Sequence, residues 1–560
     1  MFLSHHPFKI STFLDKTAQP PIHHPHKSPK LWQAPETCSS CPLPPSFPGS
    51  QITNQPLHLQ GLHHLVIPFS AMNPTAGAEH LPTFSTSTKA LKKAHLMASS
   101  PLLSPPSSSS STSNYTSSIT HAGSDQIISI LYLLPVESII SFSMTCRRFR
   151  FLSSSDSLWE SICRREWGSG SGGVDSLVAS FPPQERPRLS WKRLYEKVVQ
   201  LSSLSCRRLS CESGDFPDPR AAHSLIFFSG WLVLFGGGCD GGRHLDDTWV
   251  AYTGNGHNKV LCWKQVNSGI PSGRFGQTCT LISNYIVLFG GINDNGDRLN
   301  DTWIGEIIYD GHDDLRVTWR LLDVDVAPPP RGAHAASGVG DKRVVIHGGI
   351  GTFGLRLNDT WILYLLDDFR SGRWHQIMNV QSSPPSRSGH SLTWIAETYM
   401  VLFGGRGSRY EVLNDVWFLS IGDKNLEWKE LKYELTDLPS EMPLPQVGHS
   451  ATILPGSKIL IYGGEDSSRR RKDDFWVLDI GAPQRSQTAG LTKTSSKLWK
   501  EVKIDGRHPQ YRSFHGACTD QSRRYMYVFG GMIDGVLHPA EAYGLSFSGE
   551  LYQLELVLQL

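Results

Sequence analysis

Five histidines recur at matching places along the sequence, and imidazole is among the commonest protein ligands for transition metals. A metal-dependent catalyst would need several of these imidazoles to converge on one point. Because the five occupy equivalent positions of a repeated segment, we expect instead that each hydrogen-bonds within its own repeat as a structural residue. We therefore assign no catalytic residue, no metal site and no cofactor. The five, which end the segments RAAH, RGAH, RSGH, QVGH and RSFH, are His223, His334, His390, His449 and His515.

The ten cysteines do not form a recognisable metal motif either. Cys38 and Cys41 have C-x-x-C spacing, but no second pair of Cys or His follows at a zinc-binding interval. Scattered thiols fit a reducing compartment better than a secreted protein, so we expect a nuclear or cytoplasmic location. The net charge of +2 gives no reason to expect a nucleic-acid partner. No run of about 18 apolar residues predicts a membrane helix, so no membrane partner is expected.

The segments that carry these histidines belong to a longer repeat. Each is followed by a hydrophobic run that ends in a glycine doublet, such as MVLFGG at residues 400–405. The doublets begin at residues 236, 290, 348, 404, 463 and 530, a period of roughly 54 to 67 residues. The hexapeptide RLNDTW follows twice, as Arg298–Trp303 and Arg356–Trp361, and looser copies follow elsewhere. A run that is apolar at successive positions predicts a strand covered on both faces.

This combination resembles the kelch repeat, and the resemblance covers residues 204–560. It implies a mainly β fold, a six-bladed propeller whose blades are four-stranded sheets. We name the strands of a blade a, b, c and d, and expect them at the RxxH segment, the glycine-doublet run, the NDTW run and a later tryptophan. The sixth blade has no sequence left for a strand d. We expect residues 204–210, with Cys206 in place of that tryptophan, to pair with the C-terminal strand and close the ring.

A helical segment precedes the propeller. Between residues 124 and 168 the apolar residues return at helical spacing. This segment resembles an F-box, placed at residues 121–168, through LPV at 134–136 and CRRF at 146–149; AG stands at 122–123, where F-boxes usually carry Leu-Pro. The resemblance implies a Skp-type adaptor as partner, whereas an unrelated three-helix spacer is the alternative. The residues expected at or beside the adaptor interface are Leu134, Pro135, Ile139 and Phe142.

The remaining segments are interpreted as tail and linker. Residues 1–120 are rich in Ser, Pro, Thr and His, a composition that buries too little apolar surface to fold. A disordered tail is the simplest interpretation, and a plastid transit peptide or a translation start at Met97 are the alternatives. Residues 169–203 form a linker, flexible over 168–176 and helical over 190–201. The apolar face of that helix, with Leu194 and Val198, is expected to dock on the F-box helices or the propeller rim.

An F-box followed by a kelch propeller is typical of plant F-box/kelch-repeat proteins. The resemblance implies a non-catalytic substrate receptor: the F-box recruits a Skp-type adaptor and, through it, a cullin ubiquitin ligase, while the propeller binds the target protein. Tethering raises effective concentration, so the receptor needs no catalytic residues. A kelch scaffold without a ligase role and a metal-dependent kelch enzyme are the alternatives. Some plant relatives carry a flavin-binding domain before the F-box, but residues 1–120 contain nothing like one.

The loops between strands b and c vary most from repeat to repeat. In an antiparallel meander they share one end of the propeller with the d–a loops, and loops on a rigid scaffold carry recognition. Arginine forks suit carboxylates and phosphates, and tyrosine is a common interface anchor. We expect an acidic or phosphorylated segment of an unknown protein to bind there, centred on blades four and five, unless these arginines are only a solvated basic surface. The residues assigned to this site are Arg243, Arg298, Arg406, Arg409, Tyr410, Arg469, Arg470 and Arg471.

Overall fold

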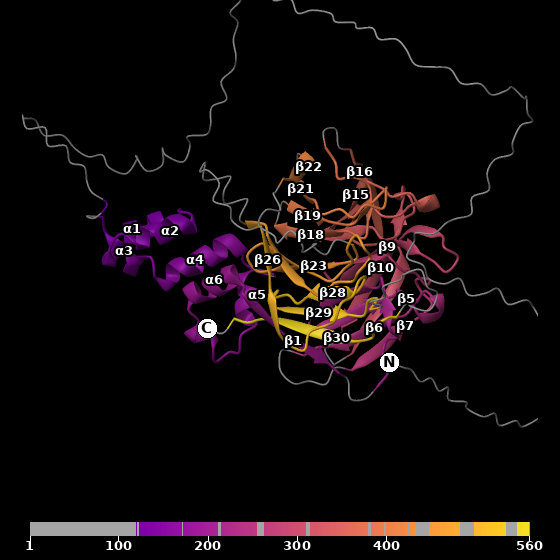
Figure 1. The fold of residues 1–560 in the computed structure, drawn as a ribbon, viewed down its shortest axis with the longest axis horizontal. Helices are drawn as coiled ribbons and strands as arrows, with labels where there is room; N and C mark the ends of the chain where they lie inside the picture. Colours follow the sequence, from indigo (N-terminus) through magenta and orange to yellow (C-terminus); the bar gives the residue numbers. More distant parts are fainter. Residues whose placement is uncertain are drawn as a thin grey trace, which may run out of the picture. The chain divides into compact units, whose positions relative to one another are not determined.

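The computed structural model describes residue 119 and residues 122–558, except residues 171, 211–213, 255–261, 310–313, 379–381, 397–398, 423–424, 433–446, 482–497 and 534–545. The tail predicted at residues 1–120 therefore lies, apart from residue 119, outside the described residues. The described part is mainly β, with a group of short helices ahead of six antiparallel sheets that form a six-bladed propeller (Figure 1).

The helices follow the apolar periodicity of the sequence. In α1 the buried residues are Ile127 and Leu131, and in α2 they are Val136 and Ile139. Pro135 caps α2 rather than occupying its first turn, because its backbone is still extended. The helices of this region are α1 (Ser124–Leu131), α2 (Val136–Ser143), α3 (Arg147–Leu152), α4 (Asp156–Trp167), α5 (Val174–Ala179), η2 (Arg186–Arg188) and α6 (Trp191–Gln200).

Helix α6 docks on the F-box helices, as its apolar face predicts. Leu194 and Val198 are buried, and the Tyr195 ring stacks on Trp167 of α4 with ring centroids 5.6 Å apart. The same helices also reach the propeller, because a Cβ at Gly456 would stand 3.3 Å from both Trp167 and Val198. The flexible linker expected over 168–176 is shorter than that, since Val174 is buried and begins α5.

Each propeller blade is a meander of four strands. Blade one comprises β3 (Ser224–Phe228), β4 (Trp231–Phe235), β6 (Thr248–Tyr252) and β7 (Trp263–Asn267), and blade two comprises β8 (Thr278–Ile282), β9 (Tyr285–Ile292), β10 (Arg298–Tyr309) and β11 (Leu315–Leu321). Blade three comprises β13 (Ala335–Val339), β14 (Arg343–His347), β15 (Thr360–Leu365) and β16 (Ser371–Ile377), and blade four comprises β18 (Ser391–Ala396), β19 (Tyr399–Phe403), β21 (Val416–Gly422) and β22 (Asn425–Leu431). Blade five comprises β23 (Ser450–Leu454), β24 (Lys458–Tyr462), β25 (Phe475–Asp479) and β26 (Trp499–Glu501).

Blade six is completed by the first strand of the propeller, which confirms the predicted ring closure. It comprises β28 (Gly516–Thr519), β29 (Tyr525–Phe529), β30 (Leu551–Leu556) and, antiparallel to β30, β1 (Ser203–Leu209) (Figure 1). Cys206 lies opposite Leu554, the register that Trp374 has with Leu363 in blade three. The thiol side chain is buried, so Cys206 occupies the place of the strand-d tryptophan.

The b strands are buried on both faces, as their continuous apolar runs predict; all five residues of β4 and of β24 are buried. The prediction that the RxxH segment forms strand a was wrong by a few residues, because β3 begins at Ser224, directly after His223. The residue before that histidine, Ala222, has a φ of 52°, which interrupts the extended backbone.

Short strands and turns occupy the end of the propeller that carries the b–c and d–a loops, which we call the b–c end. There an RxxH segment pairs with the b–c loop of its own blade, so both loops lie at this end, as predicted. The other end carries the a–b turns, and we call it the a–b end. The short elements at the b–c end are β2 (Arg220–Ala221) with β5 (Gly238–Cys239), β17 (Arg387–Ser388) with β20 (Arg406–Gly407), η3 (Asp240–Gly242) and η4 (Thr352–Gly354). Two further short strands run parallel to the first residues of a strand d: β12 (Asp323–Val324) beside β16, and β27 (Lys503–Gly506) beside β1.

Candidate functional site

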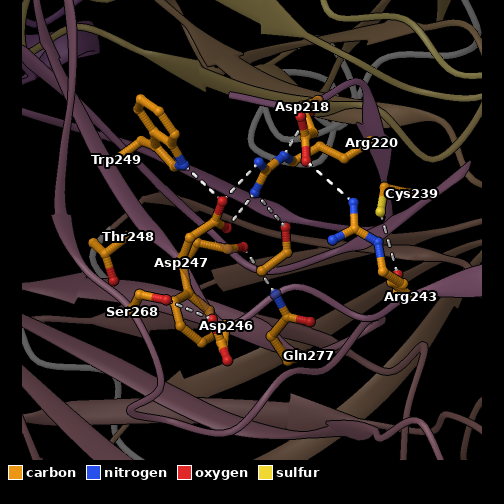
Figure 2. A network of polar contacts seen from close by, with 12 residues as sticks. Asp218, Arg220, Cys239, Arg243, Asp246, Asp247, Thr248, Trp249, Ser268 and Gln277 are labelled. Atoms are coloured by element: carbon orange, nitrogen blue, oxygen red, sulfur yellow. Dashed lines mark hydrogen bonds and ion pairs between the residues drawn. The ribbon is translucent and has the colours of Figure 1, made fainter. Parts of the chain in front are cut away.

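The arginine of each RxxH segment ties together both ends of a b–c loop. In blade one the fully buried Arg220 donates from Nη1 and Nη2 to the two carboxylate oxygens of Asp247, at 2.6 and 2.9 Å (Figure 2). Its Nη1 also donates to the carbonyl of Gly236, the residue directly after strand b. We call this contact the Arg–Asp clamp. The same bidentate pair forms in blades two, three and four, as Arg274–Asp301, Arg331–Asp359 and Arg387–Asp415.

The backbone of the same arginine joins neighbouring blades. The Arg274 N–H donates to the Leu245 carbonyl of blade one at 3.2 Å, and the Gly237 N–H donates back to the Arg274 carbonyl at 2.9 Å. Gly237, the second glycine of the doublet, has a φ of 100°, and a Cβ there would stand 2.8 Å from the Ala221 carbonyl oxygen. The doublet is therefore glycine because the backbones of adjacent segments approach too closely for a side chain.

The aspartate, threonine and tryptophan of the NDTW segment each have a hydrogen-bond partner. In blade three, Asp359 closes the clamp and also accepts a hydrogen bond from Trp361 Nε1 at 2.7 Å. Thr360 Oγ1 accepts from Nε1 of Trp428, the strand-d tryptophan of the next blade, at 3.1 Å. The aspartate therefore forms its hydrogen bonds within its own blade, and the threonine forms its hydrogen bond to the neighbouring blade. The sequence alone does not indicate this pairing, because nothing local shows that the RxxH arginine reaches the aspartate.

Four of the five repeated histidines hydrogen-bond across to the preceding blade, so for these four the expectation of hydrogen bonds within one blade was wrong. The fifth, His223, packs edge-on against Phe529 of blade six. Nε2 of His334 lies 2.8 Å from Thr278 Oγ1, and Nε2 of His515 lies 2.8 Å from Ser450 Oγ, in each case across to the preceding blade. Burial lowers the pKa of His334 to about 3, so this imidazole is neutral. Within the described residues, no three side chains of His, Cys, Asp or Glu gather in a way that could hold a metal ion.

A closed ring of backbone hydrogen bonds surrounds the propeller axis. The residue before each of these histidines, or before Gln277 in blade two, donates its N–H to the corresponding carbonyl of the preceding blade at 2.7–2.9 Å. Each of these residues has a positive φ between 52° and 64°. The ring comprises Ala222, Gly276, Ala333, Gly389, Gly448 and Phe514. The Phe514 ring lies over its neighbour, because a Cβ at Gly448 would stand 2.9 Å from it.

A cavity of about 180 Å³ adjoins this ring and is also lined by residues of the b–c loops. Arg406 Nη2 donates to Glu465 Oε1 at 2.7 Å, and Arg356 Nε donates to Ser388 Oγ at 3.2 Å. The Arg356 guanidinium also lies over the Tyr410 ring, with Cζ 4.5 Å from the ring centroid. Burial lowers the pKa of Arg356, and the charge of Arg406 acts in the same direction. The cavity is therefore a place where added negative charge would be favourable.

The arginines predicted as substrate contacts divide into two groups. Arg406 and Arg471 are nearly buried beside Glu465, with side chains only 6% and 7% exposed, so they shape the cavity rather than the outer surface. Arg243 is exposed at a distance from them in blade one and pairs with Asp218 at 3.4 Å. Arg298 is half-buried and donates to the Gly296 carbonyl. On the exposed surface of blades four and five lie Arg409, Tyr410 and Arg470, with Arg469 half-buried beside them.

Two apolar residues of the blade-three b–c loop were missed by the sequence reasoning. Phe353 is 98% exposed and has a φ of 59°, and Leu355 is 66% exposed. Both are in the same loop as Arg356, which contacts Tyr410. The signal was present in the sequence, because the b–c loop GTFGLR places a Phe and a Leu among glycines. A phenylalanine held fully exposed in a left-handed conformation is unfavourable without a partner.

The residues predicted at the adaptor interface also differ in exposure. Pro135 is exposed, Leu134 is half-buried, and Phe142 is half-buried with its ring stacked on Phe149 at 4.0 Å. Ile139 is fully buried, so in this structure it supports the surface from beneath. The exposed apolar residues of these helices that the prediction omitted are Ile130, Leu133, Ile140, Met144 and Phe151. Helical spacing could have suggested Ile140 and Met144 as neighbours, because they lie four residues apart at the C-terminal end of α2.

A helical F-box-like domain joined to a kelch propeller defines the class of this protein. The family described as F-box-like matches residues 124–165. The family described as KLHDC2/KLHL20/DRC7 Kelch-repeats domain matches residues 192–405, 362–487 and 398–557. An F-box/kelch-repeat protein of Arabidopsis thaliana is 52% identical over 465 residues, which cover 81% of this chain and 95% of that relative. The chain belongs to the F-box/kelch-repeat family.

More distant relatives match this chain over part of their length. Adagio-like protein 3 of Oryza sativa subsp. japonica is 27% identical over 415 residues, 73% of this chain and 60% of that protein. Adagio protein 3 of Arabidopsis thaliana is 26% identical over 416 residues, 73% of this chain and 62% of that protein. The chain thus spans about three fifths of these relatives. None of its described helices is long and apolar enough to cross a membrane.

Proposed function

We propose that this chain is the substrate-recognition subunit of an SCF-type ubiquitin ligase. Its F-box binds a Skp-type adaptor and, through it, a cullin, while its propeller binds the protein to be ubiquitinated. The observation that carries the proposal is the combination, in one chain, of F-box helices with exposed apolar side chains and a propeller with a basic, partly apolar b–c end. A separate enzyme transfers the ubiquitin, so the chain acts as an adaptor and needs no catalytic group. A nuclear or cytoplasmic location goes with this role.

The adaptor side of the proposal rests on apolar side chains that have no cover in the isolated chain. Leu133 is 85% exposed and Met144 is 73% exposed, and exposed apolar residues on a small domain mark an interaction surface. The turn that carries Leu133, Leu134 and Pro135 is held in place because Arg165 donates from Nη1 to the carbonyls of Tyr132 and Leu134, at 2.7 and 3.2 Å. The surface is thus presented in a fixed conformation, which lowers the entropic cost of binding.

Co-purification with a Skp-type adaptor tests this side. The Leu134→Ala/Pro135→Ala variant should lose the adaptor while its propeller keeps the wild-type melting temperature. The matched control is Leu321→Ala, which removes a 58% exposed leucine from strand d of blade two and should leave adaptor binding unchanged. If the Leu134→Ala/Pro135→Ala variant still binds the adaptor but a variant changed at Leu133 and Met144 does not, the interface lies on Leu133 and Met144 instead. If both variants bind the adaptor as the wild type does, the adaptor assignment is refuted.

The substrate side rests on the surface of blades three to five at the b–c end. An acidic or phosphorylated segment would meet Arg409 and Arg470 on the surface and the cavity between Arg356 and Arg406. Phe353 and Tyr410 supply exposed aromatic rings beside these charges, which suits a segment with an apolar residue next to its acidic group. Binding of this kind should weaken as salt rises, because exposed charges are screened.

Affinity purification with and without proteasome inhibition, followed by mass spectrometry, should give the target. Replacing Arg409, Tyr410 and Arg470 with Ala should abolish target capture while adaptor binding persists. Arg373→Ala, an exposed arginine on strand d of blade three, is the control. If capture survives the triple change but fails on mutating the a–b turns, the binding end is the opposite one. A chain that captures a target but never supports its ubiquitination with purified adaptor and cullin would be a scaffold instead.

A further inference from the structure

A second cavity lies between the a strands near the a–b end, and it does not belong to the site described above. Its volume is about 320 Å³, and it shares no lining residue with the cavity beside Arg406. The cavity is lined by the a strands of blades two to six and by the a–b turns of blades three and six. Its lining includes no aspartate or glutamate, and its only charged residue is Arg523, in the turn between β28 and β29.

The Arg523 side chain has the properties of a cation that lacks its counter-charge. No ion pair or side-chain hydrogen bond joins it to any of the residues that the structure describes. Burial lowers the pKa of its guanidinium to about 10, and no neighbouring carboxylate opposes that effect. The guanidinium is packed against the loop after α4, since a Cβ at Gly172 would stand 2.9 Å from its Nη2. A half-buried charge without a partner is costly, and its backbone here has a φ of 57°.

The rest of the lining offers hydrogen-bond donors. Thr393, Thr452 and Thr519 lie on three consecutive a strands, and their hydroxyls have no hydrogen-bond partner within the described part of the protein. Trp394 also lines the cavity, and its indole N–H is buried without an acceptor among those residues. A guanidinium, several hydroxyls and an absence of acidic groups in the lining are the chemistry that recognises an oxyanion.

We propose that this cavity binds a small soluble oxyanion, one that carries a phosphate, sulfate or carboxylate group, between Arg523 and the threonine hydroxyls of the a strands. The anion supplies the counter-charge that the protein does not provide for Arg523. Its binding also joins the a–b turn of blade six to the a strands of blades four and five, and the loop after α4 is packed against the same guanidinium. The inference concerns a different cavity from the proposed substrate site and does not depend on it.

Calorimetric titration of the full chain with sodium pyrophosphate, at ionic strength held constant with sodium chloride, tests the proposal. The wild type and the control Arg373→Gln, which removes an exposed arginine of blade three, should bind one pyrophosphate with equal affinity. Arg523→Gln should bind at least about tenfold more weakly, the usual loss when a charged hydrogen-bond partner is removed. Pyrophosphate should also raise the melting temperature of the wild type, whereas sodium chloride of equal ionic strength should not.

Two results would overturn it: wild-type binding no stronger than the chloride control, or an Arg523→Gln variant that binds as tightly as the wild type. If Arg523→Gln does not fold, the variant Thr393→Val/Thr452→Val takes its place, because it removes both hydroxyls and keeps the side-chain shape. That variant should bind pyrophosphate several-fold more weakly; unchanged binding would likewise refute the site. A melting temperature that rises equally with sodium chloride and with pyrophosphate at the same ionic strength would also count against the anion site.

Discussion

The same substitution should have opposite effects in blades four and five. In blade four, Arg387 donates to both carboxylate oxygens of Asp415 at 2.7 Å, and its side chain is fully buried. In blade five the corresponding carboxylate, Asp474, accepts from Trp476 Nε1 at 2.7 Å, and the sequence has Gln446 at the place of the clamp arginine. Gln446 lies outside the described residues. We therefore predict that Asp415→Asn destabilises the propeller and that Asp474→Asn does not.

The expected change in the free energy of unfolding depends on which groups remain after each substitution. Asp415→Asn leaves a fully buried guanidinium without its counter-charge, a change that typically costs about 3 to 5 kcal/mol. For a domain of this size, that corresponds to a fall in melting temperature of about 5 to 10 °C. Asp474→Asn removes a buried carboxylate that has no clamp arginine in the sequence, and the amide oxygen still accepts the hydrogen bond from Trp476. Its melting temperature should stay the same or rise.

The pH dependence has a definite sign in each blade. Burial acts to raise the pKa of Asp415, but the hydrogen bonds and charge of Arg387 outweigh it and hold that pKa below its usual value. Asp415 therefore stabilises the fold above the unfolded pKa of about 3.9, and this contribution is lost as the pH falls through the folded pKa. Burial raises the pKa of Asp474, so its ionisation weakens the fold as the pH rises. Any gain from Asp474→Asn should be present at pH 7 and should disappear at acidic pH.

Thermal unfolding of the full chain, followed by tryptophan fluorescence at several pH values, measures both effects. Asp473→Asn makes the same charge change at an exposed neighbouring position and should have almost no effect. If Asp474→Asn lowers the melting temperature as much as Asp415→Asn does, another cationic group of the chain pairs with Asp474 and the prediction is wrong. If Asp415→Asn is harmless, the clamp does not stabilise the blade.

Three further changes test other parts of the fold. Deleting residues 204–211 should lower the melting temperature sharply, because β1 closes the ring against β30; an unchanged value would contradict closure. Gly348→Ala should lower the free energy of unfolding, measured thermally, by more than about 2 kcal/mol, since its φ is 61° and the new Cβ would stand 2.7 Å from the Arg387 carbonyl oxygen. The control Gly354→Ala, where φ is 77° but the space around the Cβ is open, should lower it by only about 1 kcal/mol. Ser450→Ala should cost about 1 to 2 kcal/mol in the same assay by removing the partner of His515 Nε2; a neutral result would mean that the imidazole finds another.

The blades could be predicted from the sequence because a strand buried on both faces has an unmistakable composition. The run VLFGG is apolar at every position, and only the interior of a stack of sheets accommodates that. Ring closure was also predictable, since Cys206 precedes Arg220 of the first RxxH segment by 14 residues, close to the 13 residues by which Trp374 precedes Arg387. Both inferences depend on the composition of short segments and on the number of residues between them, and both can be read directly from the sequence.

The partners of the repeated polar residues could not be predicted in the same way. Arg220 and Asp247 are 27 residues apart, and His334 and Thr278 are 56 residues apart, so no local spacing joins them. Repetition shows that such residues are structural, yet it does not show whether a contact lies within a blade or between blades. The same limit applies to Arg406, which the sequence presents as a loop arginine and the structure buries against Glu465.

The Arg–Asp clamp explains how the b–c loops are free to differ. Arg220 hydrogen-bonds to Asp247, directly before strand c (Figure 2), and to Gly236, directly after strand b. The two ends of the loop are therefore fixed whatever residues lie between them. A substitution within the loop therefore leaves the hydrogen bonds at its ends intact and does not destabilise the blade. This is why the hexapeptide RLNDTW can recur in two blades while the residues before it diverge. It also means that the clamp arginines, which are fully buried, stabilise the scaffold, whereas exposed arginines such as Arg409 are available for recognition. In this family, variation at the b–c end is thus expected to change the target without changing the propeller.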